Sequence, residues 1–362
     1  MNRLIALALP ALLIVAVTLP GLAGAASYGR LRTISIPGNA LASFDIGWVD
    51  EPTETYYLAD RSNSGIDVID AKSDQFVRTI GGFVGLRTSS TSGPNGVTVA
   101  EDFHLLFAGD GDSTMKVIDL KTNQMIASVG TGGANRADEL AYDFADHVVL
   151  IANDAETVPF VTLISTVPPF TVLWHIMFGS SVLGGAATDG IEQPVWDPAT
   201  RVFYVAIPAT TVNPGGEVAV IDPRTMAVTQ VYPVSGCTPH GLALGSHQDL
   251  LLGCNVHSGP TQIMDARTGQ IEAMVSGLGG SDEVWFNKGD HHYYLAASSN
   301  TAGPVLGIID SDAETAVTPF PATAAGAHSV AADRKNNQIF VPFRAGASAA
   351  CPSGCVAVYG LS

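Results

Sequence analysis

A pattern of short strands and turns that recurs seven times predicts an all-β fold, a seven-bladed β-propeller. Each copy begins with an apolar strand, an Asp and a polar turn, and a second strand follows. The clearest copies are WVDEPTETYYLAD (48–60), VWDPATRVFYVAI (195–207) and AADRKNNQIFVPF (331–343). Each is read as a β-hairpin. The 38 Gly and 21 Pro, with only 14% charged residues, suit many short strands joined by tight turns.

The third strand of the repeat is as regular as the hairpin. It is an apolar strand that ends at an Asp, and a turn with Lys, Arg, Ser or Thr follows. The copies are IDVIDAKSD (66–74), MKVIDLKTN (115–123), VAVIDPRTM (218–226) and TQIMDARTG (261–269). A fourth strand comes next, as in FVRTI (76–80) and MIASV (125–129). Four strands per repeat predict one blade per repeat.

Alignment of the hairpins places the starts of seven inner strands at Asp45, Asn95, Asp138, Glu192, His240, Asp282 and His328. Their spacing averages about 47 residues over the six intervals from 45 to 328. A solenoid is the alternative, but it leaves two ends to cap. The last repeat has a third strand, VAVYG (356–360), and no fourth, whereas GRLRTISIP (29–37) precedes the first repeat. We therefore expect Leu31–Ile36 to pair with Val356–Tyr359 and close the ring.

The first 25 residues are predicted to be a signal peptide, and 26–362 a single propeller domain. Arg3 precedes an apolar run from Leu4 to Leu22, and Ala23-Gly24-Ala25 fits a cleavage site. An uncleaved membrane anchor is the alternative. The expected location is periplasmic or secreted. No second apolar run of that length follows.

Charge and cysteine content indicate which partners are disfavoured and how the cysteines are used. The chain has 17 basic and 34 acidic residues, a net charge of −17, which argues against nucleic-acid and anionic-membrane partners. Four cysteines in an exported chain favour disulfides, and the local pairs Cys237 with Cys254 and Cys351 with Cys355 are preferred among three connectivities. Metal ligation by these cysteines competes, but their spacing fits no zinc motif.

The VIDxxT-type third strands and the repeat length resemble the YVTN or YncE-like repeat propellers, and more loosely the SMP-30/gluconolactonase propellers. The resemblance covers nearly all of the mature chain and implies the fold. It implies less about activity, because related propellers include binders, hydrolases and metal enzymes. SMP-30-like enzymes bind their metal in the channel with Glu, Asn and Asp, a pattern from which His240 and His328 depart.

The seven inner-strand starts should form one ring around the central channel, which would bring together four carboxylates, two imidazoles and an amide. The next position adds Glu139, Gln193, Glu283 and Ser329. Polar side chains are expected around water whatever the function. The residue types here nevertheless favour a bound cation, because the ring contains no Lys or Arg to neutralise its acids.

A divalent metal would meet that need. The predicted ligands are His240 and His328, with Glu192 and Asp282 as carboxylates, a mixed set that suits Zn, Fe, Mn or Cu better than Ca. An all-oxygen calcium site of Asp45, Asn95, Asp138 and Glu192 is the alternative. Loss of metal is expected as pH falls through the histidine range near ~6.5.

The resulting hypothesis is a metal-dependent hydrolase, lactonase-like or esterase-like, that acts on a small molecule. Glu139 or Glu283 would be the general base and Arg344 would orient the substrate. Predicted ligand-binding residues are Asp45, Asn95, Asp138, Arg61 and His257. The alternatives are a non-catalytic propeller that binds a ligand or protein partner, with adaptable loops at 86–93, 179–189 and 208–216, and a copper redox enzyme. No G-x-S-x-G, H-E-x-x-H, P-loop or dinucleotide motif is present.

Overall fold

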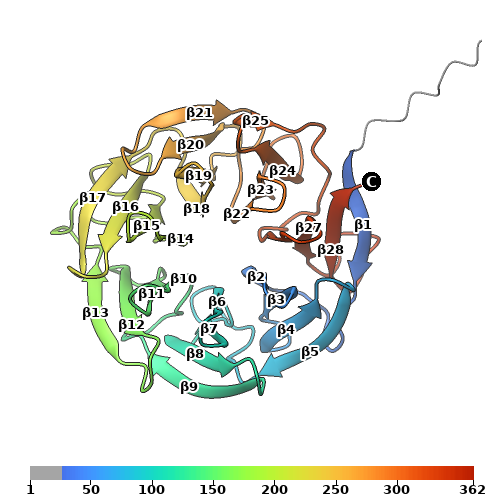
Figure 1. The fold of residues 1–362 in the computed structure, drawn as a ribbon, viewed down its shortest axis with the longest axis horizontal. Coiled ribbons are helices and arrows are strands. Elements are labelled where there is room, and N and C mark those ends of the chain that lie inside the picture. Colours follow the sequence, from blue (N-terminus) through green and yellow to red (C-terminus); the bar gives the residue numbers. More distant parts are fainter. Residues whose placement is uncertain (1–26) are drawn as a thin grey trace, which may run out of the picture.

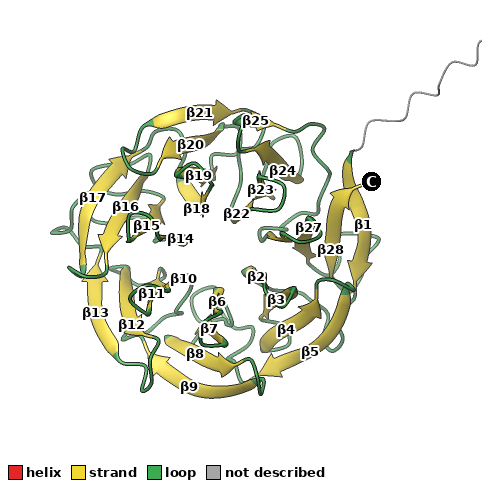
Figure 2. Ribbon diagram, in the orientation of Figure 1, coloured by secondary structure: helices red, strands yellow, loops and turns green. Residues whose placement is uncertain are grey.

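Seven four-stranded antiparallel sheets are arranged radially around a central axis in the computed structural model, which describes residues 27–362 (Figure 1). Within this range the chain consists of strands and loops without a helix (Figure 2). The predicted seven-bladed propeller is thereby confirmed. The predicted signal peptide lies outside the described residues.

Blades 1 to 6 each take four consecutive strands from the channel outward. Blade 1 comprises β2 (Gly47–Asp50), β3 (Thr55–Asp60), β4 (Gly65–Asp70) and β5 (Gln75–Gly81). Blade 2 comprises β6 (Val97–Ala100), β7 (Leu105–Asp110), β8 (Thr114–Asp119) and β9 (Gln124–Gly130). Blade 3 comprises β10 (Leu140–Asp143), β11 (Val148–Asn153), β12 (Phe160–Ser165) and β13 (Val172–Met177). Blade 4 comprises β14 (Pro194–Asp197), β15 (Val202–Ile207), β16 (Glu217–Asp222) and β17 (Ala227–Pro233). Blade 5 comprises β18 (Pro239–Leu244), β19 (Asp249–Cys254), β20 (Thr261–Asp265) and β21 (Ile271–Val275). Blade 6 comprises β22 (Val284–Asn287), β23 (His292–Ala297), β24 (Val305–Asp310) and β25 (Thr315–Ala316). Blade 7 has β26 (Ala331–Asp333), β27 (Gln338–Phe343), β28 (Cys355–Leu361) and, outermost, β1 (Tyr28–Ile34).

The repeated Asp at the end of each third strand stabilises the turn that follows. In blade 1 the Asp70 carboxylate accepts hydrogen bonds from the backbone N–H groups of Lys72 and Ser73, at 3.0 and 2.8 Å. The turn then ends at a residue with positive φ, Asp74 at 56°. Side chains of Asp commonly mimic a backbone turn in this way. These motifs therefore have a structural role at the lower face, which we define as the face that carries the turns between first and second strands.

The core lies between the blades, where the flat faces of neighbouring sheets pack. Tyr56 of blade 1 stacks on Phe340 of blade 7, with ring centroids 5.0 Å apart, and both side chains are fully buried. Seven apolar clusters of this kind repeat around the ring. Because every blade shares its core with both neighbours, the ring is stable only when it is closed.

Closure occurs in blade 7, where the N-terminal strand pairs with the C-terminal strand. β1 runs antiparallel to β28, with Arg32 opposite Val358 and Ile34 opposite Val356 (Figure 1). The predicted pairing of the chain ends is confirmed.

Both predicted disulfides are present, Cys237–Cys254 within blade 5 and Cys351–Cys355 in the loop before β28. No free cysteine remains in the described part of the chain. The two bonds fit an oxidising, extracellular environment. Between residues 27 and 362 there is no helix that is long and apolar enough to cross a membrane.

The two disulfides should differ in their effect on stability. Cys237–Cys254 has a sequence separation of 17 and Cys351–Cys355 a separation of 4. Loop-closure entropy then gives about 3 kcal/mol for the longer loop and about 2 kcal/mol for the shorter one. We expect C237A/C254A to lower the free energy of unfolding in guanidinium more than C351A/C355A. A larger loss of unfolding free energy in C351A/C355A than in C237A/C254A would contradict this prediction.

Candidate functional site

The predicted ring of channel residues is formed at the upper face, opposite the hairpin turns. Five of its members lie two residues ahead of the inner strand of their blade. Each of them donates its backbone N–H to the second strand of the same blade; they are Asp45, Asn95, Asp138, Glu192 and Asp282. His240 lies within β18, and His328 precedes β26 by three residues. The ring positions thus lie at or just before the inner strands, and most do not start them.

Neighbouring blades are joined at this level by backbone hydrogen bonds. The residue after a ring position donates its N–H to the carbonyl of the next ring residue: Gly96 to Asp138 at 3.3 Å, Gln193 to His240 at 3.2 Å and Glu283 to His328 at 3.1 Å. These bonds fix the height of the ring side chains relative to one another. The site therefore rests on rigid elements.

A cavity of about 410 Å³, here called the upper basin, opens inside the ring. It is lined by Asp45, Ile46, Arg61, Arg136, Asp138, Glu139, Glu192, His240, Asp282, Glu283, Ser298, Ser299, Gly326, His328 and Arg344. Its volume suits a small molecule. Of the predicted site residues, Asn95 is fully buried outside the lining and His257 is exposed on the loop after β19.

Arg61 neutralises the acid of blade 1. Its guanidinium forms an ion pair with Asp45 and donates two hydrogen bonds to the side-chain oxygen of Asn95, at 3.0 and 2.7 Å. Burial alone would raise the pKa of Asp45, but Arg61 and then His328 lower it to about 2. Arg61 and Asn95 are therefore already engaged with each other and with Asp45.

Arg136 has the same role in blade 3, and the sequence analysis missed it. Its guanidinium lies 2.7 Å from Asp138 and makes a bidentate pair with Asp154, at 3.1 and 2.6 Å. Asp138, followed by Asp154, raises the pKa of Arg136 further above its usual range. The expectation that the ring acids need an external cation is wrong for this half of the basin. Arg136 comes from the loop between blades 2 and 3, whereas Arg61 and Arg344 come from loops within blades 1 and 7.

The opposite half of the basin, in blades 4 to 6, has no such compensation. His240 Nδ1 lies 3.8 Å from Glu192 Oε1 and 3.5 Å from Asp282 Oδ1, and its Nε2 lies 3.0 Å from the Asn255 amide nitrogen. Among the described residues, neither carboxylate forms an ion pair with Arg or Lys. Burial, then the charges of Asp154 and Asp282, raises the pKa of Glu192 well above its usual range. The two halves of the basin therefore differ in how their acids are paired.

His328 has partners different from those of His240. Its Nε2 lies 3.3 Å from Asp45 Oδ1, its Nδ1 lies 2.9 Å from the Gly326 carbonyl oxygen, and its ring stacks on Phe44 at 4.8 Å. Burial opposes protonation of this imidazole, but Asp45 raises its pKa above the usual value. Both predicted histidines thus line the basin, His240 with Glu192 and Asp282, and His328 with Asp45.

The floor of the basin is a pair of buried acids, Glu139 and Glu283, which are 7% and 3% exposed. Burial, and then Glu283, raises the pKa of Glu139 well above its usual range; burial and then Asp282 do the same for Glu283. One oxygen of Glu139 is buried without a hydrogen-bond partner. The pair can therefore hold a proton at neutral pH.

Below the acids the channel narrows to a cavity of about 30 Å³. Trp48 and Trp285 meet edge to face beside it, with centroids 5.1 Å apart. The Gln193 oxygen accepts hydrogen bonds from the N–H groups of Leu242 and Val284, at 2.8 and 3.4 Å. The channel is therefore much narrower below the two acids than in the upper basin.

Arg344 lies at the rim of the basin and is exposed. Its guanidinium carbon is 5.9 Å from the centroid of the Phe44 ring, and among the described residues it has no ion-pair partner. Ser298 and Ser299 of blade 6 contribute hydroxyl groups to the same rim. A cation without a carboxylate partner at the mouth of a polar basin can hold an anionic ligand.

Comparison with protein-family models gave no match, and comparison with curated protein sequences gave none either. Among solved structures, a chain in the crystal structure of a mitotic checkpoint complex aligns with a TM-score of 0.70 and 11% identity, over 99% of this chain and 98% of that chain. At this identity the likeness shows the fold alone. The protein is thus a seven-bladed β-propeller, and its resemblance to YVTN and SMP-30 propellers stays a prediction.

Proposed function

We propose that the upper basin is a metal-dependent hydrolytic site for a small lactone or ester. The observation that carries this proposal is the position of His240 Nδ1 between Glu192 and Asp282, at 3.8 and 3.5 Å, in the half of the basin without an arginine. A mixed N/O donor set suits Zn, Mn, Fe or Cu better than Ca. His328 is a candidate fourth ligand once it releases Asp45.

Each remaining part of the basin has a role in this proposal. A bound divalent ion supplies carbonyl polarisation and a water of lowered pKa. In the Glu139–Glu283 pair, the ionised carboxylate would act as the general base and the protonated carboxyl would donate a proton to the leaving oxygen. Arg344 orients a carboxylate on the substrate from the rim.

Metal binding is tested with protein that has been stripped by a chelator and then titrated with Zn, Mn, Fe and Cu salts. We expect one ion per chain, at least a hundredfold loss of affinity in E192Q and H240A, and a smaller loss in H328Q. H257A is the matched control, because His257 is an upper-loop histidine outside the basin. Affinity should fall as pH drops, because protonated ligands do not bind metal and the pKa of Glu192 is raised by burial.

Hydrolysis is tested on a panel of lactones and esters with the loaded protein and with E283Q. We expect E283Q to retain the metal and lose turnover. Absence of a stoichiometric ion, or unchanged affinity in both E192Q and H240A, would contradict the metal site. Metal binding without turnover would contradict only the hydrolase assignment.

A non-catalytic binding function is the second candidate, favoured by apolar side chains on the upper loops. Leu183 and Val212 are 50% and 66% exposed, on the loops 179–189 and 208–216 that meet at an Ala187–Thr210 bridge. The similar solved chain belongs to a mitotic checkpoint complex. If the L183S/V212S variant keeps full metal affinity and turnover, these two exposed side chains have no part in the upper basin. They would then be available for contact with a protein partner.

A further inference from the structure

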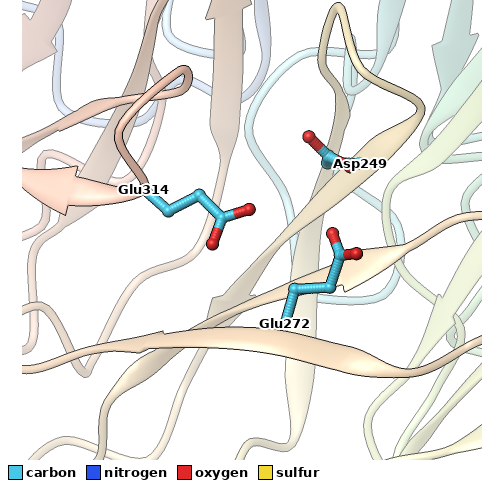
Figure 3. A group of neighbouring side chains, drawn as sticks. All are labelled: Asp249, Glu272 and Glu314. Atoms are coloured by element: carbon cyan, nitrogen blue, oxygen red, sulfur yellow. The ribbon is translucent and has the colours of Figure 1, made fainter.

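Three carboxylates converge at the lower face, between blades 5 and 6 and remote from the upper basin (Figure 3). Asp249 is the first residue of β19, Glu272 lies in β21, and Glu314 immediately precedes β25. One oxygen from each lies within 4.8 Å of one oxygen from each of the others. We call this group the lower acidic site.

Asp249 occupies a repeat position that carries no acid in any other blade. The first residues of the other second strands are Thr55, Leu105, Val148, Val202, His292 and Gln338. Elsewhere this position is therefore filled by apolar, hydroxyl, imidazole or amide side chains. An acid here is not required by the propeller turn, so it needs another explanation.

The Asp249 side chain is buried without a compensating partner. The residue is 6% exposed, its carboxylate accepts no hydrogen bond from any donor in residues 27–362, and it is directed at Glu272 and Glu314 (Figure 3). No Arg or Lys in this range forms an ion pair with any of the three acids. Burial, and then the charge of Glu272, raises the pKa of Asp249 to about 6. The charge of His247 lowers the pKa of Asp249, but this imidazole bonds Asp312, at 2.9 Å.

The dimensions of the lower acidic site match a calcium ion. Oxygens that bind one Ca²⁺ at 2.3–2.6 Å lie at most about 5 Å apart, so the three acids are close enough to share one coordination sphere. The set contains only oxygen, which favours a hard cation over zinc or copper. Glu272 is exposed, which leaves room for water to complete the six to eight ligands that Ca²⁺ takes.

We propose that Asp249, Glu272 and Glu314 bind one Ca²⁺ ion that links blades 5 and 6. The link has a structural purpose. β25, the outer strand of blade 6, has only two residues, Thr315–Ala316, and Glu314 directly precedes it. An ion held in common with β19 and β21 would fasten this short strand to the neighbouring blade.

The test is a Ca²⁺ titration of chelator-stripped protein, followed by calorimetry and by the melting temperature. We expect one Ca²⁺ per chain, a melting temperature that rises with Ca²⁺ concentration, and at least a tenfold loss of affinity in D249N and in E272Q. Tb³⁺ gives a local readout. The Tyr293 hydroxyl bonds the Asp249 carbonyl at 3.1 Å, so tyrosine-sensitised Tb³⁺ emission should appear and be lost in both variants.

Two controls separate this site from the others. E192Q alters the upper basin and should leave Ca²⁺ affinity unchanged, and E101Q alters an exposed acid in the lower-face turn before β7 and should do the same. D249N should be at least as stable as wild type without Ca²⁺, because it removes charge repulsion. No heat of binding and no shift in melting temperature at millimolar Ca²⁺, or full affinity in both D249N and E272Q, would overturn the proposal.

Discussion

Deletion of residues 27–37 is expected to cause the largest loss of stability that any short deletion in this chain can produce. It removes β1 and leaves β28 as an unpaired edge. It also removes the buried side chain of Ile34 and the 3.1 Å ion pair between Arg32 and Asp74 of blade 1. Domains of this kind are stable by only about 5–15 kcal/mol, and an open ring exposes two blade faces.

The measurement is thermal unfolding followed by circular dichroism, with aggregation followed by light scattering. The matched control is R30A, which removes one exposed side chain from β1 and keeps both its backbone pairing and the Arg32–Asp74 ion pair. We expect the control to melt close to wild type and the deletion variant to melt far lower or to aggregate. Equal melting temperatures for the deletion variant and wild type would show that closure does not depend on β1.

Replacement of Arg136 by Met is expected to have the second largest effect. The side chains of Arg136, Asp138 and Asp154 are 20%, 6% and 10% exposed, so R136M leaves two carboxylates largely buried without a cation. Removal of one partner from such a network costs roughly 3–5 kcal/mol. We expect the guanidinium midpoint to fall accordingly at pH 7.

The triple variant R136M/D138N/D154N serves as the control, because it removes the charges along with the arginine. It should recover more than half of the lost free energy. R136M should also gain stability relative to wild type as pH falls. Burial already raises the pKa of Asp138 well above its usual range, and loss of the arginine removes the main charge that lowers it, so this carboxyl becomes neutral by protonation. A R136M variant as stable as wild type would show that the network contributes nothing to folding.

The R136M variant also bears on the proposed function. With Arg136 gone, the charge of Asp138 and Asp154 is no longer balanced near Glu192, whose pKa those two acids already raise. Arg136 therefore balances part of the acidic charge in one half of the upper basin, whereas among the described residues the acids around His240 form no ion pair with Arg or Lys. The metal site is proposed at His240 because the arginines pair with acids in the other half of the ring.

The sequence by itself determined the architecture. Hairpins such as 48–60 and turns such as Asp70 to Asp74 are local, since their hydrogen bonds join residues a few positions apart, and seven copies can be aligned without a structure. Repetition also located the ring of channel residues, because equivalent positions in radial repeats must face the same axis. The closure by β1 and the two disulfides followed from strand count and cysteine spacing.

Only the tertiary structure decided which charges meet. Arg136 reaches Asp154, 18 residues away in the sequence, and Glu139 of blade 3 interacts with Glu283 of blade 6 across the channel. His328 bonds Asp45, 283 residues away, and His240 lies with Glu192 and Asp282. Such contacts depend on side-chain direction and on loops between blades, neither of which has a period in the sequence. The repeat therefore encodes the ring, and the packing of seven blades sets the chemistry inside it.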